Sequence, residues 1–354
     1  MRETLAAWRP AIDDAIQEVI PREVDEAYLT EYFGDAAYRY DPRAIQRALS
    51  DPIWDLLDRG GKRWRAVLFL VFVDAFGEDP ADYLPYAAIP EILHNGTIIV
   101  DDVEDDATMR RGEPALHHRF GTDVALNAGN AMYFIPLKII THDPGSLDDG
   151  TRLRAYEMLM HELNRTHLGQ GMDICWHNDA EITVDASAYL EMCACKTGCL
   201  GRIVARLAAI VTGQDVETER AVAAYAESVS IAFQIGDDIL DVEHSLGEAG
   251  DFGKAFGNDV REGKQTLMAI HAVANAPSAD ATRLQEILAA DTNTDEEILE
   301  AIDVLQSAGS VEFARETALS LADEAVGYLD DLDLEAEPER DLRGFTEFVV
   351  ERDV

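Results

Sequence analysis

Apolar residues recur three and four positions apart along most of the chain, which is the spacing of one face of an α-helix. The pattern is clearest in three segments, residues 151–176, 221–242 and 311–332. Alternation of apolar and polar residues, typical of a half-buried strand, is scarce. Turn compositions rich in Gly, Pro, Asp and Asn separate the helical segments, at residues 77–85, 141–151, 177–185, 246–259 and 274–280. The chain is therefore predicted to be all-α.

Neither a linker composition nor a short internal repeat divides the chain, so we expect one domain, residues 1–354, of about a dozen helices. The longest strongly apolar run, Ala66 to Val73, is too short for a transmembrane helix and suits a buried one. The N-terminal residues are polar and charged, unlike a secretory or transit segment. We expect no transmembrane segment and a cytoplasmic location.

The composition adds a strong negative charge. The 69 Asp and Glu residues against 29 Lys and Arg give a net charge of -40, and only five of the basic residues are lysines. Such a surface repels nucleic acid and anionic membranes, and it favours a salt-adapted protein of a halophile. Most acidic residues are therefore expected to be solvated surface groups, and an acidic cluster needs further support before it indicates a site.

The four cysteines do not indicate a metal site. They are Cys175, Cys193, Cys195 and Cys199. Their spacing matches no common zinc pattern, and no histidine lies at a typical distance from them. We expect reduced thiols in the core.

Two copies of the pattern Asp-Asp-x-x-Asp stand out against this background. Their residues are Asp101, Asp102, Asp105, Asp237, Asp238 and Asp241. One copy could arise by chance in so acidic a chain. Two copies inside apolar helical patterns are much harder to attribute to surface charge.

Carboxylates in this arrangement favour a magnesium site. Asp101 and Asp105 are four residues apart and share a helix face, as do Asp237 and Asp241. Close carboxylates repel one another unless a cation neutralises them. Oxygen ligands alone suit Mg²⁺, which commonly bridges one or two carboxylates to substrate phosphates. Two such faces across a helix bundle would hold a diphosphate between metal ions, and His94 continues the first face.

The scarce lysines and two arginines indicate phosphate binding. Lys62, Lys196, Lys254 and Lys264 lie in stretches that contain Gly or Thr, whereas Lys138 is expected to be an ordinary lysine. None of these stretches matches a Walker loop. Arg110 and Arg111 follow the first acidic motif, where they either neutralise its carboxylates as ion pairs or bind phosphate.

These stretches together resemble the trans-isoprenyl diphosphate synthases, the polyprenyl synthetase family. The ordered blocks are GGKRWR, EILHNGTIIVDDVEDDATMRRG, HLGQGMDICW, CKTG, FQIGDDILD, GKAFGND and EGKQT. Ala66 stands where the family usually has proline, and Asn130 replaces an acidic residue in LNAGNAMYF. Neither is among the metal ligands that the resemblance implies.

The resemblance implies an isoprenoid synthase fold, with helices around a central cavity, and a homodimer. It implies about two or three Mg²⁺ ions held by the six aspartates of the two motifs. Those six residues with Arg110 and Lys196 would form the catalytic set. Isopentenyl diphosphate would bind Gly61, Lys62, Arg65, His94 and Arg111. The allylic diphosphate would bind Arg110, Lys196, Thr197, Phe233, Gln234 and Lys254, with Lys264 nearby. The implied reaction is a head-to-tail condensation.

Residues before Asp101 on the same helix would set the product length, namely Leu93, Gly96 and Thr97. The family often places aromatic residues near the last two, and small ones here imply growth beyond C15, mainly to geranylgeranyl diphosphate (C20). A farnesyl or longer-chain synthase is an alternative. A non-catalytic synthase subunit, a terpene cyclase and an acidic structural helical protein are further ones. Both acidic motifs are complete, which argues against a non-catalytic subunit. The basic set implied for isopentenyl diphosphate argues against a terpene cyclase, and the positions of the lysines argue against a structural protein.

Overall fold

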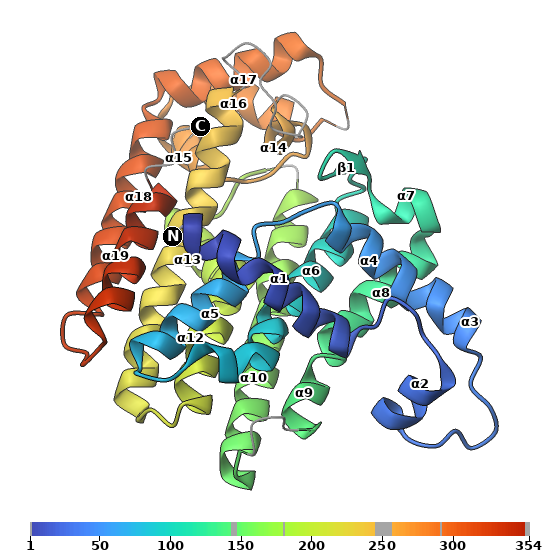
Figure 1. Ribbon diagram of the computed structural model, residues 1–354. Coiled ribbons are helices and arrows are strands. Elements are labelled where there is room, and N and C mark those ends of the chain that lie inside the picture. Colours follow the sequence, from blue (N-terminus) through green and yellow to red (C-terminus); the bar gives the residue numbers. More distant parts are fainter. Residues whose placement is uncertain (1, 143–146, 180, 245–256, 291, 351–354) are drawn as a thin grey trace. The chain divides into compact units, whose positions relative to one another are not determined.

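The computed structural model describes the chain except residues 1, 143–146, 180, 245–256, 291 and 351–354 (Figure 1). Lys254 therefore lies outside the described residues. The described chain forms two compact units. Unit 1 contains residues 1–159, 207–215 and 334–338, and unit 2 contains residues 160–206, 216–333 and 339–354. The boundaries between the units fall within the long helices α10 (Asp149–His177) and α12 (Cys199–Val211), and near the start of α19 (Ala336–Val350).

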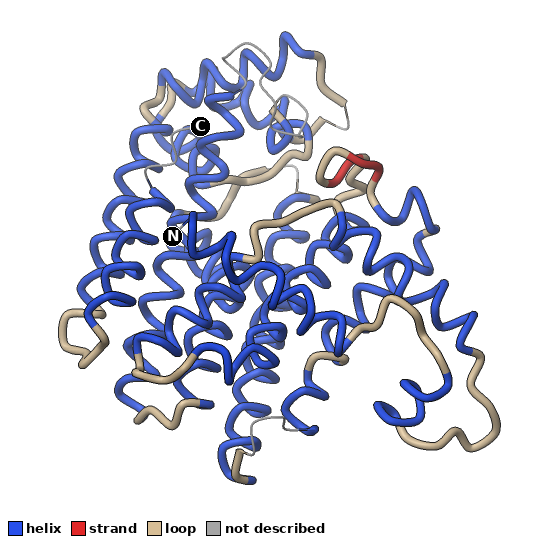
Figure 2. The backbone as a smooth tube through the Cα atoms, viewed as in Figure 1, coloured by secondary structure: helices blue, strands red, loops and turns tan. Residues whose placement is uncertain are grey.

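Unit 1 is helical apart from one small hairpin, drawn red in Figure 2. Its remaining elements are α1 (Arg2–Val19), α2 (Glu26–Phe33), α3 (Pro42–Ile45), the π-helical turn η1 (Gln46–Ser50), α4 (Asp51–Asp58), α5 (Trp64–Ala75), the 3₁₀ turn η2 (Pro80–Tyr83), α6 (Leu84–Glu104), β1 (Met109–Arg110), β2 (Glu113–Pro114), α7 (Leu116–Phe120), α8 (Thr122–Phe134) and α9 (Leu137–His142).

Unit 2 contains helices and loops but no strand among its described residues. Besides parts of α10, α12 and α19, it contains α11 (Ala186–Cys193), the π-helical turn η3 (Ala194–Gly198), α13 (Val216–His244), α14 (Asn258–Arg261), α15 (Leu267–Asn275), α16 (Ser278–Leu288), α17 (Asp295–Ser307) and α18 (Ser310–Gly327). The all-α prediction is confirmed. The described helices outnumber the dozen expected because short segments such as α3, α7 and α14 are separate helices.

Helix α5 forms the centre of unit 1. Only Trp64 and Asp74 of its residues are not buried, and the apolar run from Ala66 to Val73 is enclosed on all sides. It packs against α1 and α6. A helix that is apolar all round must be buried, so this run is a core helix, as expected. Among the described residues, no helix is both long and apolar enough to cross a bilayer.

Helices α6 and α8 approach closely because glycines meet at their crossing. A Cβ added at Gly96 of α6 would lie 2.8 Å from the Cβ of Met132 and 3.1 Å from the carbonyl oxygen of Gly129 on α8. A Cβ added at Gly129 would lie 2.9 Å from Val100. These contacts leave no room for a side chain, so the pair of glycines fixes the position of the carboxyl-terminal half of α6.

Helix α13 packs along α18 in unit 2, as the two labelled helices in Figure 1 show. The buried side chains of α18 are small, namely Ser310, Ala314, Ala318, Ala322 and Ala325. Small residues let the two helix backbones approach closely. Helix α13 also packs against η3 and α11, which brings the segment 189–197 next to the second acidic motif.

Candidate active site

The first acidic motif lies at the carboxyl end of α6, in unit 1. Asp101 and Asp102 belong to the last turn of the helix, whereas Asp105 is its C-cap. The backbone N–H of Asp105 donates to the carbonyl oxygen of Asp101 over 2.8 Å. Asp101 and Asp105 are half-buried and Asp102 is buried. The one-turn separation of Asp101 and Asp105 is present as predicted, although the helix ends one residue before Asp105.

Asp102 forms an ion pair with Arg110. The carboxylate is 3% exposed, and the Arg110 Nε donates to Oδ1 over 2.7 Å while a second guanidinium nitrogen donates to the same oxygen. Burial raises the pKa of Asp102, and Arg110 opposes that rise. Of the two alternatives for Arg110, the structure contains the ion pair. The Arg110 side chain keeps 27% of its surface exposed, so the pair and a contact with phosphate are compatible.

The turn between Arg110 and Glu113 explains the sequence Arg-Arg-Gly. Residues 110 and 113 pair across the hairpin, which leaves Arg111 and Gly112 as a two-residue loop. Both have positive φ, 53° and 77°, as a type I′ turn requires. Glycine adopts this conformation without strain, and the turn directs Arg111 to partners different from those of Arg110.

Arg111 joins three segments of unit 1. One guanidinium nitrogen donates to the carbonyl oxygens of Leu56, over 3.1 Å, and Gly60, over 2.8 Å. The other donates to Asn95 Oδ1 on α6 over 3.0 Å. Burial lowers the pKa of Arg111 to about 10, so it remains charged at neutral pH. None of these bonds goes to the first acidic motif, so they do not support the alternative in which Arg111 neutralises its carboxylates.

The loop before α5 requires glycine at Gly61. Its φ is +119°, a conformation that residues with a Cβ rarely adopt. A Cβ here would also lie 3.0 Å from a guanidinium nitrogen of Arg63 and 3.4 Å from one of Arg111. The loop backbone can therefore approach these two cations only without a side chain.

His94 is a neutral imidazole among cations. Burial and the guanidinium groups of Arg65 and Arg111 lower its pKa well below the ordinary value. Among the described residues its Nδ1 has no hydrogen-bond partner. Arg65 is buried, with its guanidinium carbon 4.1 Å from the centroid of the Trp64 ring, and Lys62 is exposed. Because Arg65 and Arg111 both lower the pKa of His94, these three predicted ligands of isopentenyl diphosphate lie close together. Gly61 lies beside Arg111.

Arg63, which lies between the predicted ligands Lys62 and Arg65 in the sequence, has a structural position. It is 2% exposed and caps α5 with a φ of 53°. Its Nε donates to Asp13 over 2.8 Å and another nitrogen donates to the Leu57 carbonyl over 3.1 Å. These bonds attach α1 and α4 to the loop, so Arg63 supports the site and does not line it.

The second acidic motif lies within α13 of unit 2. Asp237 and Asp241 are half-buried, and Asp238 is buried. Asp238 accepts hydrogen bonds from the Tyr189 hydroxyl, over 2.7 Å, and from Gln234 Nε2, over 3.0 Å. Burial raises the pKa of Asp238. The carboxylate of Asp241 accepts a bond from the backbone N–H of Asp259 over 3.1 Å.

The middle aspartate is buried in both motifs. Asp102 and Asp238 are each buried and held by donors of the protein, whereas the first and last aspartates are half-buried. The family resemblance implied all six as metal ligands. The structure separates them into two anchored carboxylates and four that are more open to solvent.

Lys196 and Thr197, two of the residues predicted to bind an allylic diphosphate, belong to η3. The Lys196 Nζ forms an ion pair with Asp173 at 2.5 Å, and the Thr197 hydroxyl donates to Gln234 Oε1 over 3.2 Å. Phe233 precedes Gln234 on α13 and is half-buried. Single π-helical turns within helices are frequent at functional sites, and this one turns Lys196 and Thr197 toward α10 and α13.

Lys264 lies between α14 and α15, in unit 2. Its Nζ is 2.6 Å from Glu262 and 3.9 Å from Asp259, the residue whose N–H binds Asp241. Lys264 is thus attached to the segment that contacts the second motif. Lys254, predicted as its companion, lies outside the described residues.

The predicted chain-length residues differ in their access. Leu93 is fully buried, and Gly96 contacts α8 as described above. Thr97 is half-buried and its hydroxyl donates to the His94 carbonyl over 2.7 Å. A large residue at position 96 would separate α6 from α8, so position 97 is the better place to test product length.

One group escaped the sequence reasoning. Asp106, His117 and His118 have ligand atoms within 4.8 Å of one another, the one such group of three found within the described residues. The adjacent histidines were a visible signal. The four cysteines are free thiols. Cys193, Cys195 and Cys199 are buried, as predicted, whereas the prediction of a core thiol was wrong for Cys175, which is exposed.

Known proteins resemble this chain over its whole length. The sequence model of the polyprenyl synthetase family matches residues 46–305. A geranylfarnesyl diphosphate synthase of Natronomonas pharaonis is 30% identical, with 99% of this chain and 98% of that one covered. The solved geranylgeranyl pyrophosphate synthetase of Pyrococcus horikoshii has a TM-score of 0.84 at 28% identity, covering 99% of both chains.

A geranylgeranyl pyrophosphate synthase of Corynebacterium glutamicum, crystallised with isoprenyl diphosphate and magnesium, has the same fold. Its TM-score is 0.80 at 22% identity, with 100% of this chain and 99% of that one covered. The helical architecture thus defines an isoprenoid synthase fold, and its carboxylate motifs fit an enzyme that uses a divalent metal. The chain belongs to the polyprenyl synthetase family and is a prenyltransferase. The predictions of family, fold and enzyme class are confirmed.

Proposed function

We propose that this prenyltransferase condenses isopentenyl diphosphate head-to-tail with an allylic diphosphate, mainly to geranylgeranyl diphosphate. The observation that carries the proposal is the contrast within both acidic motifs. The buried Asp102 and Asp238 are anchored by protein donors, and their neighbours one residue before and three residues after are half-buried carboxylates. Two such motifs, with a separate group of cations around Arg111, suit two diphosphates.

The donor set suits Mg²⁺, because the candidate ligands are all carboxylate oxygens. About two or three ions would bind the half-buried carboxylates of Asp101, Asp105, Asp237 and Asp241. The buried Asp102 and Asp238 would orient these four ligands. When bound, Mg²⁺ supplies positive charge that stabilises the leaving diphosphate. Removal of divalent ions by EDTA should abolish turnover, and added Mg²⁺ should restore it.

The chain's own cations bind the two diphosphates. Lys196 and Arg110 hold the allylic diphosphate, and Thr197 and Gln234 donate further hydrogen bonds. Lys264 lies nearby, and Lys254, outside the described residues, is a further phosphate ligand that only the family resemblance implies. Gly61, Lys62, Arg65, His94 and Arg111 hold isopentenyl diphosphate. Fixed positive charge favours the transition state in which negative charge moves to the leaving group.

The condensation needs no protein nucleophile. The allylic C–O bond breaks, and its electron pair leaves with the diphosphate. The isopentenyl double bond attacks the allylic cation, and the released diphosphate takes the proton lost as the new double bond forms. The role of the protein is to orient the two substrates and to bind both diphosphates.

Product length follows from the small residues before Asp101. Thr97 lies one turn before this aspartate on α6, and Thr97→Phe should shift the products toward C15. Thr122→Phe, at an exposed position at the start of α8, is the matched control and should leave the distribution unchanged. Full-length products from Thr97→Phe would place the end of the product cavity elsewhere. The geranylfarnesyl synthase relative makes C25 the competing product.

The decisive experiment incubates the protein at high salt with Mg²⁺, labelled isopentenyl diphosphate and C5, C10 or C15 allylic primers. We expect elongation from each primer to C20, resolved by thin-layer chromatography after dephosphorylation. Incorporation that stops at C15 or proceeds to C25 would correct the product, and no incorporation from any primer would contradict the proposal.

We also propose that residues 1–354 act as one isoprenoid synthase domain and form a homodimer, as the family resemblance implies. The coverage of 99% of both chains by the Pyrococcus structure supports the single domain. Light scattering coupled to size exclusion should give twice the mass of 39.0 kDa. A monomer that is fully active would contradict the dimer.

A further inference from the structure

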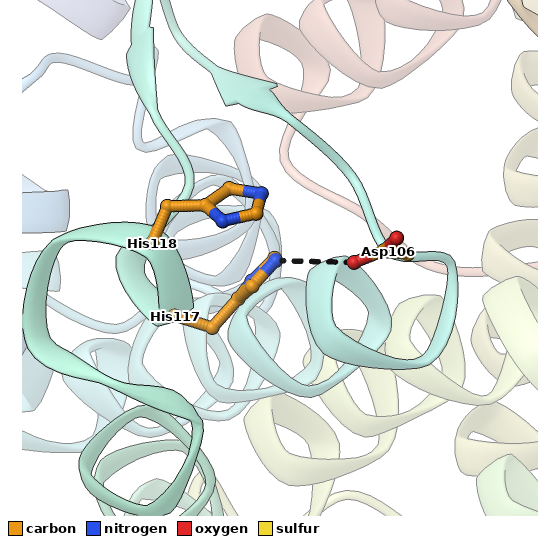
Figure 3. A group of neighbouring side chains, drawn as sticks. All are labelled: Asp106, His117 and His118. Atoms are coloured by element: carbon orange, nitrogen blue, oxygen red, sulfur yellow. Dashed lines mark ion pairs between the residues drawn. The ribbon is translucent and has the colours of Figure 1, made fainter.

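A group of three potential metal ligands lies beyond the first acidic motif, in unit 1. Asp106 follows the C-cap of α6, and His117 and His118 are in α7, from where their rings face Asp106 (Figure 3). One nitrogen or oxygen atom from each of the three lies within 4.8 Å of the others. The two imidazole rings are 4.1 Å apart between centroids. Neither histidine belongs to the predicted substrate or metal sites.

His117 is the observation that points to a ligand. Its side chain is 6% exposed, yet neither ring nitrogen has a hydrogen-bond partner among the described residues. The nearest charged atom, Asp106 Oδ1, is 3.9 Å from Nε2. Buried polar groups are nearly always satisfied, and leaving one unsatisfied costs about 1–3 kcal/mol. A bound cation would satisfy one of these nitrogens.

We propose that Asp106, His117 and His118 bind a divalent transition-metal ion of the Zn²⁺ type. Two imidazoles and one carboxylate are a frequent ligand set for such an ion, with a water molecule in the open position. Ligand atoms around tetrahedral Zn²⁺ are roughly 3.3 Å apart, since each bond is about 2.0–2.1 Å. The side chains must therefore close by about 1.5 Å from their present separation.

The surroundings permit this closure. His117 is fixed by burial, whereas the Asp106 side chain is 95% exposed and His118 is exposed, so both can rotate toward it. Asp106 has a φ of 50°, in the left-handed region. Burial lowers the pKa of His117, which keeps the imidazole in the neutral form that binds metals.

The ligand type separates this site from the proposed magnesium sites. Imidazole nitrogen binds Zn²⁺, Co²⁺, Ni²⁺ and Cu²⁺ strongly, whereas Mg²⁺ prefers oxygen. Excess Mg²⁺ should therefore fill the acidic motifs and the acidic surface without competing for the histidines. The inference goes beyond the proposed function, and its test measures metal binding without turnover.

The experiment titrates Zn²⁺ into the full-length protein in excess Mg²⁺, followed by calorimetry. We expect one equivalent to bind, with an affinity that His118→Gln and Asp106→Asn each reduce at least about tenfold. Asparagine tolerates positive φ, so Asp106→Asn removes the charge and keeps the turn. His161→Gln, at an exposed histidine of α10, is the control and should bind as the unchanged protein does.

Copper provides a second measurement that does not depend on affinity. The electron paramagnetic resonance spectrum of one bound Cu²⁺ should show coupling to two imidazole nitrogens, and to one in His118→Gln. The proposal is overturned if no Zn²⁺ binds in excess Mg²⁺. It is equally overturned if both site variants bind Zn²⁺ as tightly as the His161→Gln control.

Discussion

Replacing Gly169 by alanine tests the close contact that positions η3, the turn proposed to bind the allylic diphosphate. A Cβ at Gly169 of α10 would lie 2.3 Å from the backbone nitrogen of Lys196 and 2.7 Å from the carbonyl carbon of Cys195. The shorter distance falls short of ordinary contact by about 1.1 Å. Both neighbours are backbone atoms, so no flexible side chain can yield, and η3 itself must move.

The size of this movement sets the expected effects. Forcing an extra methyl group into a packed contact costs about 1–3 kcal/mol of folding free energy. A displacement of about 1 Å at a substrate-positioning residue costs on the order of 10²-fold in rate. Lys196 and Thr197 belong to η3 and would move with it. The Lys196 Nζ pairs with Asp173 at 2.5 Å. Gly169→Ala should therefore lower kcat/KM for the allylic diphosphate about 10²-fold while the protein remains folded.

The same helix provides the matched control. Gly171 is exposed, and a Cβ there would meet no atom within 4 Å. Gly171→Ala should be fully active and more stable by about 0.5–1 kcal/mol, because alanine favours the helix. Steady-state kinetics and thermal unfolding of both variants, in the same high-salt buffer, make the comparison. If Gly169→Ala matches Gly171→Ala in rate and stability, the close approach of α10 and η3 is refuted.

Three further predictions concern charge. Arg110→Met leaves the buried Asp102 without its cation and should lower the free energy of unfolding by about 3 kcal/mol, measured by denaturant unfolding. The double variant that adds Asp102→Asn should regain part of this loss. An unchanged unfolding midpoint would contradict the ion pair. Glu162, fully buried, has a pKa that burial tends to raise but that Arg202 and Arg206 lower below 4.5 overall. The ionised Glu162 therefore stabilises the fold above its pKa in the unfolded chain, and this stabilisation is lost as the pH falls through its pKa in the folded protein. Glu162→Gln should lower the free energy of unfolding by about 2 kcal/mol at pH 7 and leave it unchanged in acid. With a net charge of -40, the protein should melt at a lower temperature when multimolar KCl is dialysed away, and an unchanged melting temperature would refute a salt-adapted surface.

The helices could be predicted from the sequence because burial imposes a period on it. Segments 151–176 and 221–242 lie within α10 and α13, and the described turn compositions fall at helix ends. The third segment, 311–332, was predicted too long, since α18 ends at Gly327. Acidic residues at positions 330, 331 and 333 follow that end, where the helix dipole disfavours negative charge. The hairpin of β1 and β2 was missed because strands of two residues are too short to show alternation.

Candidate site residues could be proposed from the sequence, but which of them the protein's own groups hold in place could not. Lys62 and Arg65 lie in one short stretch with Arg63, and all three are cations suited to phosphate. Only the structure shows that Arg63 is bound to Asp13 and the Leu57 carbonyl. Its partners are distant in the chain, and spacing carries no information about them.

The paired aspartates show why adjacent identical residues need not share a role. On a helix, neighbouring side chains point about 100° apart, so a face that presents Asp101 to solvent turns Asp102 toward the protein. A buried carboxylate must then be paired or protonated, and Arg110 supplies the pair in the first motif. In the second motif neutral donors, the Tyr189 hydroxyl and the Gln234 amide, hold Asp238. Because a cation compensates more charge than neutral donors do, loss of Arg110 should affect stability more than loss of the Tyr189 hydroxyl. The buried aspartate is thus held by a cation in one motif and by neutral donors in the other, a difference that the sequence Asp-Asp-x-x-Asp does not reveal.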